Sequence, residues 1–329
     1  MRTRVLQTAA LIGATVAQLT IGCQKKTETP AGAASGNTEV AAAAPRSFPL
    51  VELRAQLKTR VTVETERSAA PQPPVGTFDK VFYDAPLGKN VAYVSPAKNG
   101  VKRPAMVWIA GGMDWGIGAD AWEPAPRSND QSAGAFRKSG EIVLMRPSLR
   151  GSNENPGHNE CFLGEVADVL AAADYLAKRP DVDPNRIYLG GHSTGGTMVL
   201  LTVASSDRFR AAFAFGPVAD PRQYGSGGCL PPDIANAEAL PRSPVHFLKD
   251  VRTPTWIIEG AQGNANVFPF LEKAKGSAPI TFVLIPKANH FSTLAPTTEA
   301  LAAQILADTG PTVRFNLDPT ELTKSVSTE

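Results

Sequence analysis

The sequence predicts an α/β protein in which helices cover both faces of a mostly parallel, eight-stranded sheet. Residues 77–310 alternate between short runs rich in β-branched and aromatic residues and longer helical stretches, the order typical of such a sheet. The run at 186–190 leads directly into a turn flanked by glycines and then into an apolar helix. Apolar residues make up 43% of the 329 residues, which is enough to bury a sizeable core.

Each predicted strand is a short apolar run bounded by turn residues. The first two runs form a hairpin that turns at Leu87-Gly88-Lys89, and the later runs are separated by helices, which places them in the parallel part of the sheet. The eight predicted strands cover residues 78–83, 90–95, 104–110, 141–145, 186–190, 209–215, 255–259 and 281–285. We expect a further edge strand or a tail at 313–317.

Four helices are predicted between and after the strands, at residues 162–178, 195–205, 268–275 and 297–308. The last is closed by Gly310 and Pro311, residues that commonly end a helix. Before the sheet, residues 48–68 predict a short amphipathic helix followed by a strand-like run at 60–64. A long insertion at 217–254 separates two strands and predicts a small cap-like element.

The first 22 residues have the layout of a secretory signal. Arg2 and Arg4 precede an apolar stretch at 5–22, which stops at Cys23. The residues Thr20-Ile21-Gly22-Cys23 resemble a bacterial lipobox, which predicts that Cys23 is lipidated. Two alternatives remain open: an uncleaved anchor helix, because the stretch is about the minimum spanning length, and ordinary cleavage that discards Cys23.

These features predict five segments and an exported, lipid-anchored protein of the bacterial cell envelope. A signal peptide (1–22) precedes the lipidated cysteine and a disordered tether rich in Ala, Gly, Thr and Pro (23–46). An N-terminal extension (47–75), a catalytic domain (76–310) and a C-terminal tail or edge strand (311–329) follow. Gln24 after the cysteine would favour the outer membrane in a Gram-negative cell, and the periplasm is the other Gram-negative location.

The net charge limits the classes of partner that the protein can be expected to bind, and the predicted export bears on the state of its cysteines. The formal net charge is +2, which is too small to suggest a nucleic-acid partner. Membrane contact is expected through the lipid anchor. In an oxidising compartment, Cys161 and Cys229 are either joined in a disulfide or remain two unrelated buried thiols.

The strongest chemical motif is Gly191-His192-Ser193-Thr194-Gly195. A strand that runs into a helix through so tight a turn lifts one side chain above the sheet, and the close backbone approach requires small residues two positions to either side. The amides at the start of the following helix then favour negative charge beside the serine. The motif predicts Ser193 as an activated nucleophile.

A histidine that follows the final core strand is expected to return over this turn and act as the base. Of the four histidines, His290 has that position, and the order Ser then His matches the arrangement of such folds. His192 lies beside the serine with its side chain expected to point elsewhere. His158 lies in a polar loop and His246 lies between strands.

The acid that should orient His290 is not at its usual place. The expected window after the strand at 255–259 reads Gly263-Asn264-Ala265 and contains no carboxylate. Glu259, at the carboxyl end of that strand, could reach the histidine with its longer side chain. Asp220, after the preceding strand, is the second candidate, and both remain open.

Main-chain amides are expected to stabilise an oxyanion beside Ser193. The strand at 104–110 ends in Gly111-Gly112-Met113, and a glycine pair there lets an N–H turn toward a substrate carbonyl. We expect donors from Gly112 or Met113 and from Thr194, the residue after the nucleophile. Met113, Trp115 and Trp122 are candidates for lining the pocket, with core packing as the alternative for the aromatic residues.

Several motifs together point to one family. They are Leu149-Arg-Gly-Ser152, Ala172-Ala-Asp-Tyr-Leu176, Val182-Asp-Pro-Asn-Arg-Ile187, Gly191-His-Ser-Thr-Gly-Gly196 and Ala288-Asn-His-Phe291. The sequence resembles the catalytic domain of the prolyl oligopeptidase and dienelactone hydrolase group of α/β hydrolases, across about residues 78–310. The resemblance implies the α/β-hydrolase fold and an architectural role for Arg150.

The chemistry implied is acyl transfer through Ser193 and His290, without a metal or organic cofactor. The sequence contains no HExxH, no CxxC and no convincing phosphate-binding loop. Three functions remain open: an esterase acting on small esters, a serine peptidase of the prolyl oligopeptidase type acting on short peptides, and a non-catalytic binding lipoprotein that retains the fold.

Overall fold

The computed structural model describes residues 47–65 and 67–326. The predicted signal peptide (1–22), Cys23 and the predicted tether lie outside the described residues. Within these residues, no helix combines the length and the apolar character that crossing a membrane requires.

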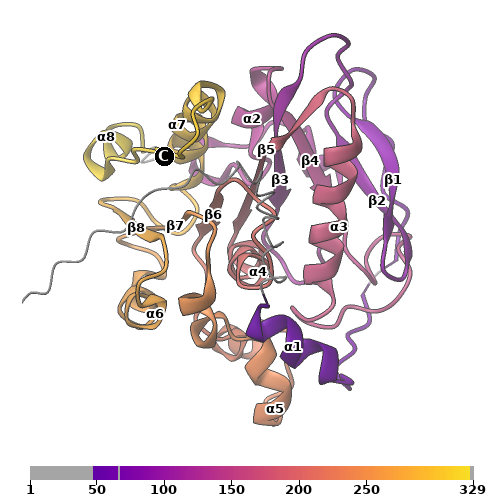
Figure 1. Ribbon diagram of the computed structural model, residues 1–329, viewed down its shortest axis with the longest axis vertical. Coiled ribbons are helices and arrows are strands. Elements are labelled where there is room, and N and C mark those ends of the chain that lie inside the picture. The colour runs from indigo at the N-terminus through magenta and orange to yellow at the C-terminus, as the bar shows by residue number, and fades with distance from the viewer. Residues whose placement is uncertain (1–46, 66, 327–329) are drawn as a thin grey trace, which may run out of the picture. The chain divides into compact units, whose positions relative to one another are not determined.

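A single eight-stranded sheet forms the centre of the described part of the chain (Figure 1). Its strands lie in the order β1-β2-β4-β3-β5-β6-β7-β8. The strands are β1 (Asp79–Ala85), β2 (Gly88–Val94), β3 (Arg103–Ile109), β4 (Val143–Pro147), β5 (Val182–His192), β6 (Ala212–Phe215), β7 (Thr255–Gly260) and β8 (Ile280–Ile285). All eight predicted strands are present, so the predicted fold class is confirmed.

The sheet is antiparallel at one edge and parallel elsewhere. β1 pairs with β2 and β2 with β4 in antiparallel fashion, whereas β4, β3, β5, β6, β7 and β8 pair in parallel. The carboxyl ends of the parallel strands therefore lie at one edge of the sheet. Side chains that follow β3, β5, β6, β7 and β8 meet there, at the edge where open α/β sheets bind ligands.

Two buried cores cover the two faces of the sheet. One face packs against α3 (Glu165–Lys178), α4 (Thr194–Val203) and α6 (Phe268–Lys275). The other packs against α2 (Gly134–Lys138), α7 (Leu294–Ala307) and α8 (Pro319–Lys324). α4 is buried along its whole length, because it is covered by the sheet on one side and by neighbouring helices on the other.

The insertion at 217–254 folds into short helical pieces, as expected of a small cap. They are η3 (Pro221–Gly227), α5 (Asn236–Ala239), η4 (Leu240–Arg242), η5 (Pro244–His246) and η6 (Leu248–Asp250). α1 (Pro49–Gln56) of the N-terminal extension lies beside α5 (Figure 1). Arg54 Nη2 joins the two segments by donating to the carbonyls of Pro241 and Phe162 at 2.9 Å.

Cys161 and Cys229 form a disulfide, with Cα atoms 5.7 Å apart. Of the two alternatives left by the sequence, the structure has the bridged one. Beside it, the rings of Phe162 and Tyr224 stack with centroids 6.0 Å apart. The bridge therefore ties the loop before α3 to the cap.

Two predicted strands are not formed. The run at 60–64 makes a single bridge, Val63 to Asn159. The run at 313–317 joins no strand, because Gln304 satisfies both the N–H and the carbonyl of Asn316 and Phe315 packs onto Trp256 with ring centroids 5.3 Å apart. Of the two alternatives expected for this segment, an edge strand or a tail, the structure has the tail, which ends in α8.

Candidate active site

Ser193 occupies the tight turn between β5 and α4 with φ 56° and ψ −114°. Positive φ is unfavourable for a residue with a side chain, and such strain is typical of a nucleophile held above a sheet. Ser193 N donates to Phe215 O at 2.7 Å, which fixes the turn against β6. A side chain at Gly191 would collide with the Gly195 carbonyl, and one at Gly195 with the Ile109 carbonyl, so the glycine spacing has the steric basis expected from the sequence.

His290 lies beside this turn and is paired with Glu259. Its Nδ1 lies 2.8 Å from Glu259 Oε2, and Glu259 Oε1 accepts from Gly260 N at 2.7 Å. The Glu259 side chain is 1% exposed and that of His290 is 16% exposed. A buried carboxylate on Nδ1 leaves Nε2 as the nitrogen that can take a proton from outside.

Glycine residues make room for this pair. Gly216 has φ +55°, and a Cβ there would overlap His290 Cε1 and come within 2.5 Å of Nδ1. A Cβ at Gly263 would come within 2.5 Å of Glu259 Oε1. The position of Gly216, directly after a strand that neighbours the nucleophile strand, is the signal by which the sequence could have identified it.

Asp220 does not join the His290 pair. Its carboxylate accepts from Arg222 N at 2.9 Å, which caps η3, and forms an ion pair of 2.6 Å with Arg222 Nη2. Burial opposes its ionisation, but the hydrogen bonds from Arg222 hold the pKa of Asp220 below its usual range. Of the two candidate acids, the structure therefore pairs Glu259 with the imidazole and gives Asp220 a structural partner.

The predicted oxyanion donors lie around Ser193. A Cβ built on Gly111 would lie 3.3 Å from Ser193 Cβ, so the loop after β3 passes next to the nucleophile. The Thr194 hydroxyl donates to the Gly112 carbonyl and ties this loop to α4. In the described chain, the N–H groups of Gly112, Met113 and Thr194 make no backbone hydrogen bond, so they are available to a substrate oxygen.

In the described chain the His290 ring hydrogen-bonds Glu259, and Ser193 Oγ makes no hydrogen bond. Such catalytic contacts commonly tighten when substrate binds. The position of His290 is fixed by its hydrogen bond to Glu259 and by the close approach of its ring to Gly216.

Two hollows flank Gly111, with volumes of about 340 and 380 Å³. They share Ala110, Gly111 and Asp120, and most of their lining is polar or small. Trp115 lines only a narrow cavity of about 10 Å³ and is buried against Phe162, with ring centroids 4.9 Å apart. Trp122 packs edge-on against Tyr93 at 5.1 Å. Core packing is therefore the correct reading for both tryptophans, whereas Met113 is half-buried in the loop itself.

Arg150 has the architectural role that the sequence predicted. Its guanidinium donates to both carboxylate oxygens of Asp168, at 3.0 and 2.9 Å, and also reaches Glu160. The main-chain N–H of Arg150 donates to Asp168 as well. These bonds fix the loop after β4 onto α3.

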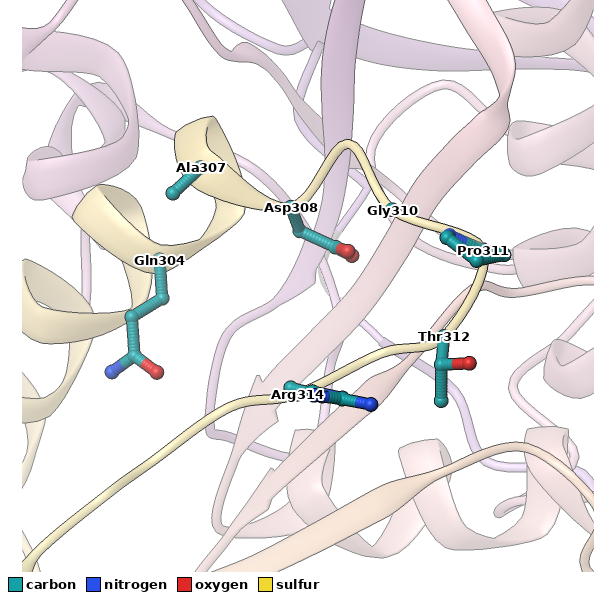
Figure 2. A pocket seen from close by; sticks show the side chains of 7 residues that line it. All are labelled: Gln304, Ala307, Asp308, Gly310, Pro311, Thr312 and Arg314. Atoms are coloured by element: carbon teal, nitrogen blue, oxygen red, sulfur yellow. The ribbon is translucent and has the colours of Figure 1, made fainter.

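A separate hollow of about 390 Å³ lies where α7 ends (Figure 2). Asp308 and Arg314 line it, together with glycine, proline and other short side chains. Arg210 forms a two-fold ion pair with Asp308, and Tyr188 donates to the same carboxylate at 2.6 Å. Its acid is neutralised and no histidine lines it to activate the Thr312 hydroxyl, so we place the active site at Ser193 instead.

Besides Gly216, two residues of the site were missed by the sequence analysis. His192 was assigned no role, yet its buried ring contacts both His290 and Gln131. Gln131 was not identified, and no local motif marks it, because it reaches the site from the loop before α2.

Comparisons with known proteins agree with the fold and with the motifs found in the sequence. A model of the prolyl oligopeptidase family matches residues 141–260, the region that contains both Ser193 and Glu259. An uncharacterized peptidase of Bacillus subtilis, YuxL, is 28% identical over 175 residues, which is 45% of this chain and 26% of that protein.

Solved structures share the fold. A puromycin-hydrolyzing peptidase of Mycobacterium tuberculosis superposes with a TM-score of 0.56 and 21% identity, covering 75% of this chain and 42% of that one. An acylaminoacyl peptidase of Pyrococcus horikoshii superposes with a TM-score of 0.57 and 16% identity, and the match covers 75% of this chain and 44% of that one. An esterase of Pyrobaculum calidifontis superposes with a TM-score of 0.52 and 16% identity, and the match covers 78% of this chain and 88% of that one. The chain spans less than half the length of these peptidases, and the shared part has the α/β-hydrolase fold.

Proposed function

We propose that this serine hydrolase cleaves carboxylic esters through an acyl-enzyme on Ser193, with His290 as general base and Glu259 as the acid that orients it. The observation that carries the proposal is the buried pair of Glu259 and His290 next to the strained serine turn, with a 2.8 Å contact on Nδ1. The same three side-chain roles define the serine hydrolase triad on unrelated folds.

The first half of the reaction forms the acyl-enzyme. His290 Nε2 takes the proton of Ser193 Oγ as the oxygen attacks the ester carbonyl. Glu259 stabilises the imidazolium, and the free N–H groups of Gly112 or Met113 and of Thr194 bind the oxyanion. The imidazolium then gives its proton to the leaving alcohol as the carbon–oxygen bond breaks.

The second half releases the acid. Water enters in place of the alcohol, and His290 removes one of its protons as the oxygen attacks the acyl carbon. The tetrahedral intermediate then collapses: His290 gives this proton to Ser193 Oγ as the bond from Oγ to the acyl carbon breaks, which releases a carboxylic acid. Every proton moves through His290, so no metal or organic cofactor takes part. Ester substrates need no further binding domain for this chemistry, and the two hollows beside Gly111 offer space for small substituents.

Covalent labelling tests the proposal directly. A fluorophosphonate should modify Ser193, and Ser193→Ala should abolish both labelling and turnover of p-nitrophenyl esters. Ser206→Ala is the control, at a half-buried serine after α4 whose hydroxyl accepts from Arg208 N, and it should change neither. Intact, folded protein that remains unlabelled would show instead a binding lipoprotein that has kept the fold.

A peptidase acting on short peptides is the second candidate function. The match to the prolyl oligopeptidase family and the similarity to YuxL favour it. Aminoacyl-nitroanilides, assayed beside the esters, separate the two. A peptidase would give kcat/KM values for anilides comparable with those for esters, whereas an esterase should favour esters by several orders of magnitude because amides are intrinsically less reactive.

We also propose that the protein is exported and attached to the cell envelope through a lipid on Cys23. The basic residues, the apolar stretch and the lipobox-like residues before Cys23 support this. Metabolic labelling with a radioactive fatty acid should mark the full-length protein but not its Cys23→Ala variant. A Cys23→Ala variant that is labelled equally would contradict the proposal.

A further inference from the structure

We infer that His192, the residue before the nucleophile, is a positioning residue that holds the main chain of the His290 loop in place. His192 Nε2 lies 3.0 Å from the carbonyl oxygen of His290. A carbonyl can only accept, so Nε2 carries the proton and donates it. The inference rests on the proposed role of His290 as the base, and it adds a residue to which the reaction itself gives no role.

The surroundings of His192 suit a fixed support. The residue is fully buried. The centroid of its ring lies 4.5 Å from that of the His290 ring and 5.4 Å from that of the Phe291 ring. Its Nδ1 lies 3.2 Å from the Gln131 side-chain amide. The ring therefore bridges the base loop and Gln131, whose amide borders Gly111 of the oxyanion loop.

The protonation state follows from these contacts. The groups that face His192 are His290, which carries Glu259 on its far nitrogen, the neutral Gln131 amide and the Phe291 ring. Burial, and then the adjacent His290, lower the pKa of His192 to about 3, so the ring stays neutral at the pH values where esterases work. Nδ1 is then an acceptor. The Gln131 atom that lies 3.2 Å from it is Oε1, so the bond forms when the Gln131 amide is rotated by half a turn and its NH2 group donates to Nδ1.

A neutral support is what the base requires. When His290 takes the proton of Ser193 it becomes a cation, and a second cation 4.5 Å away would oppose that step. Glu259 fixes the His290 ring at Nδ1, while His192, and the Thr293 hydroxyl at 3.4 Å, fix its carbonyl. The ring and the main chain of the base are thus held from separate directions.

Substituting His192 by Gln or by Asn distinguishes its bond to the His290 carbonyl from its contact with Gln131. The amide nitrogen of Gln lies as many bonds from Cβ as Nε2 does, so His192→Gln can still donate to the His290 carbonyl. The amide of Asn corresponds to Nδ1, so His192→Asn keeps the Gln131 contact and loses the bond to His290. The matched control is His246→Asn, at an exposed histidine that ends η5.

The measurements are kcat and KM on a p-nitrophenyl ester, per active site counted by fluorophosphonate titration. Losing one such hydrogen bond in the transition state corresponds to about a tenfold change in rate. We expect His192→Asn to lower kcat about tenfold with KM little changed and the acid limb of the pH profile unmoved, and His192→Gln to recover most of the loss. Equal kcat values in both variants, or a loss explained entirely by fewer titratable sites, would overturn the inference.

Nitrogen-15 NMR of the wild-type imidazoles keeps the inference testable if a variant does not fold. His192 should appear as a neutral ring protonated at Nε2 between pH 5 and pH 9. A His192 that titrates in this range, or that is protonated at Nδ1, would contradict it. Failure of the proposed function has a different signature, because the wild-type protein itself would then not be labelled.

Discussion

The two sides of Ser193 are built differently. On the base side, formed by Glu259, His290 and His192, both carboxylate oxygens and three ring nitrogens have hydrogen-bond partners. The substrate side is formed by the loop at 110–118 and the loop at 148–164, which the disulfide ties to the cap. There the main-chain donors make no backbone hydrogen bond and two hollows lie beside Gly111. Hydrogen bonds therefore fix the groups that transfer protons before a substrate arrives. The side that must admit the substrate has unpaired N–H donors and open volume instead.

The largest expected effect comes from the acid of the base side. Glu259→Gln keeps the shape but removes the charge that stabilises the imidazolium, and should lower kcat by about a thousandfold or more. Asp220→Asn, which touches only the capped Arg222 pair, should stay within about twofold of the wild type. Steady-state ester hydrolysis checks both, and the reverse ranking would reassign the acid.

The next effect tests how tightly the base side is packed. In Gly216→Ala the new methyl group would overlap the His290 ring, so we expect at least about a hundredfold lower kcat, because small misplacements of a catalytic group are costly. Gly225→Ala is matched, since its φ of +58° is similar and a Cβ there meets no atom within 4 Å. It should lose stability but retain kcat. Equal activity losses would show that backbone strain, not contact with His290, is responsible.

The disulfide tests the substrate side. Replacing Cys161 and Cys229 by Ser removes a bridge across 68 residues, which corresponds to about 3–4 kcal/mol in the free energy of unfolding. KM should rise several-fold while kcat changes little, because the bridge joins the cap to its loop and does not touch the base side. Urea denaturation and ester kinetics measure this. Reductant should reproduce the effect in the wild type and leave the double variant unchanged.

The smallest expected effect is on the pH dependence of the free energy of unfolding, and it comes from Glu165 at the start of α3. Burial raises its pKa from 4.5 to about 7, so the folded protein binds a proton more tightly than the unfolded chain does. Stability from this group is present at low pH, declines above pH 4.5 and is lost above pH 7, a change of about 2 kcal/mol between pH 5 and pH 8.

Glu165→Gln should remove this pH dependence, because the amide cannot ionise and its oxygen can still accept from Glu160 N. Thermal or urea unfolding at pH 5 and pH 8 provides the measurement. A variant whose stability declines between these pH values as steeply as the wild type's would show that other groups cause the decline. Glu272→Gln, on the exposed surface of α6, is the control and should behave as the wild type.

The sequence by itself determined the fold class, the eight strands and the roles expected of Ser193 and His290. These follow from local signals: the apolar period of each strand, and glycine spacing that only a tight strand-to-helix turn requires. It also limited the acid to Glu259 or Asp220 and restricted a possible disulfide to Cys161 and Cys229, but could go no further, because the choice depends on which loops meet in space.

Tertiary structure decided the rest. It paired Glu259 with His290 at the ends of adjacent strands β7 and β8, buried Trp115 in the core, and replaced an expected edge strand by side-chain bonds from Gln304 to Asn316. It also brought Gln131 and Gly216 to the site from distant segments. Such contacts join segments that are far apart in the sequence, and they depend on where the carboxyl ends of the parallel strands lie in space. No local sequence pattern predicts which of these segments will meet.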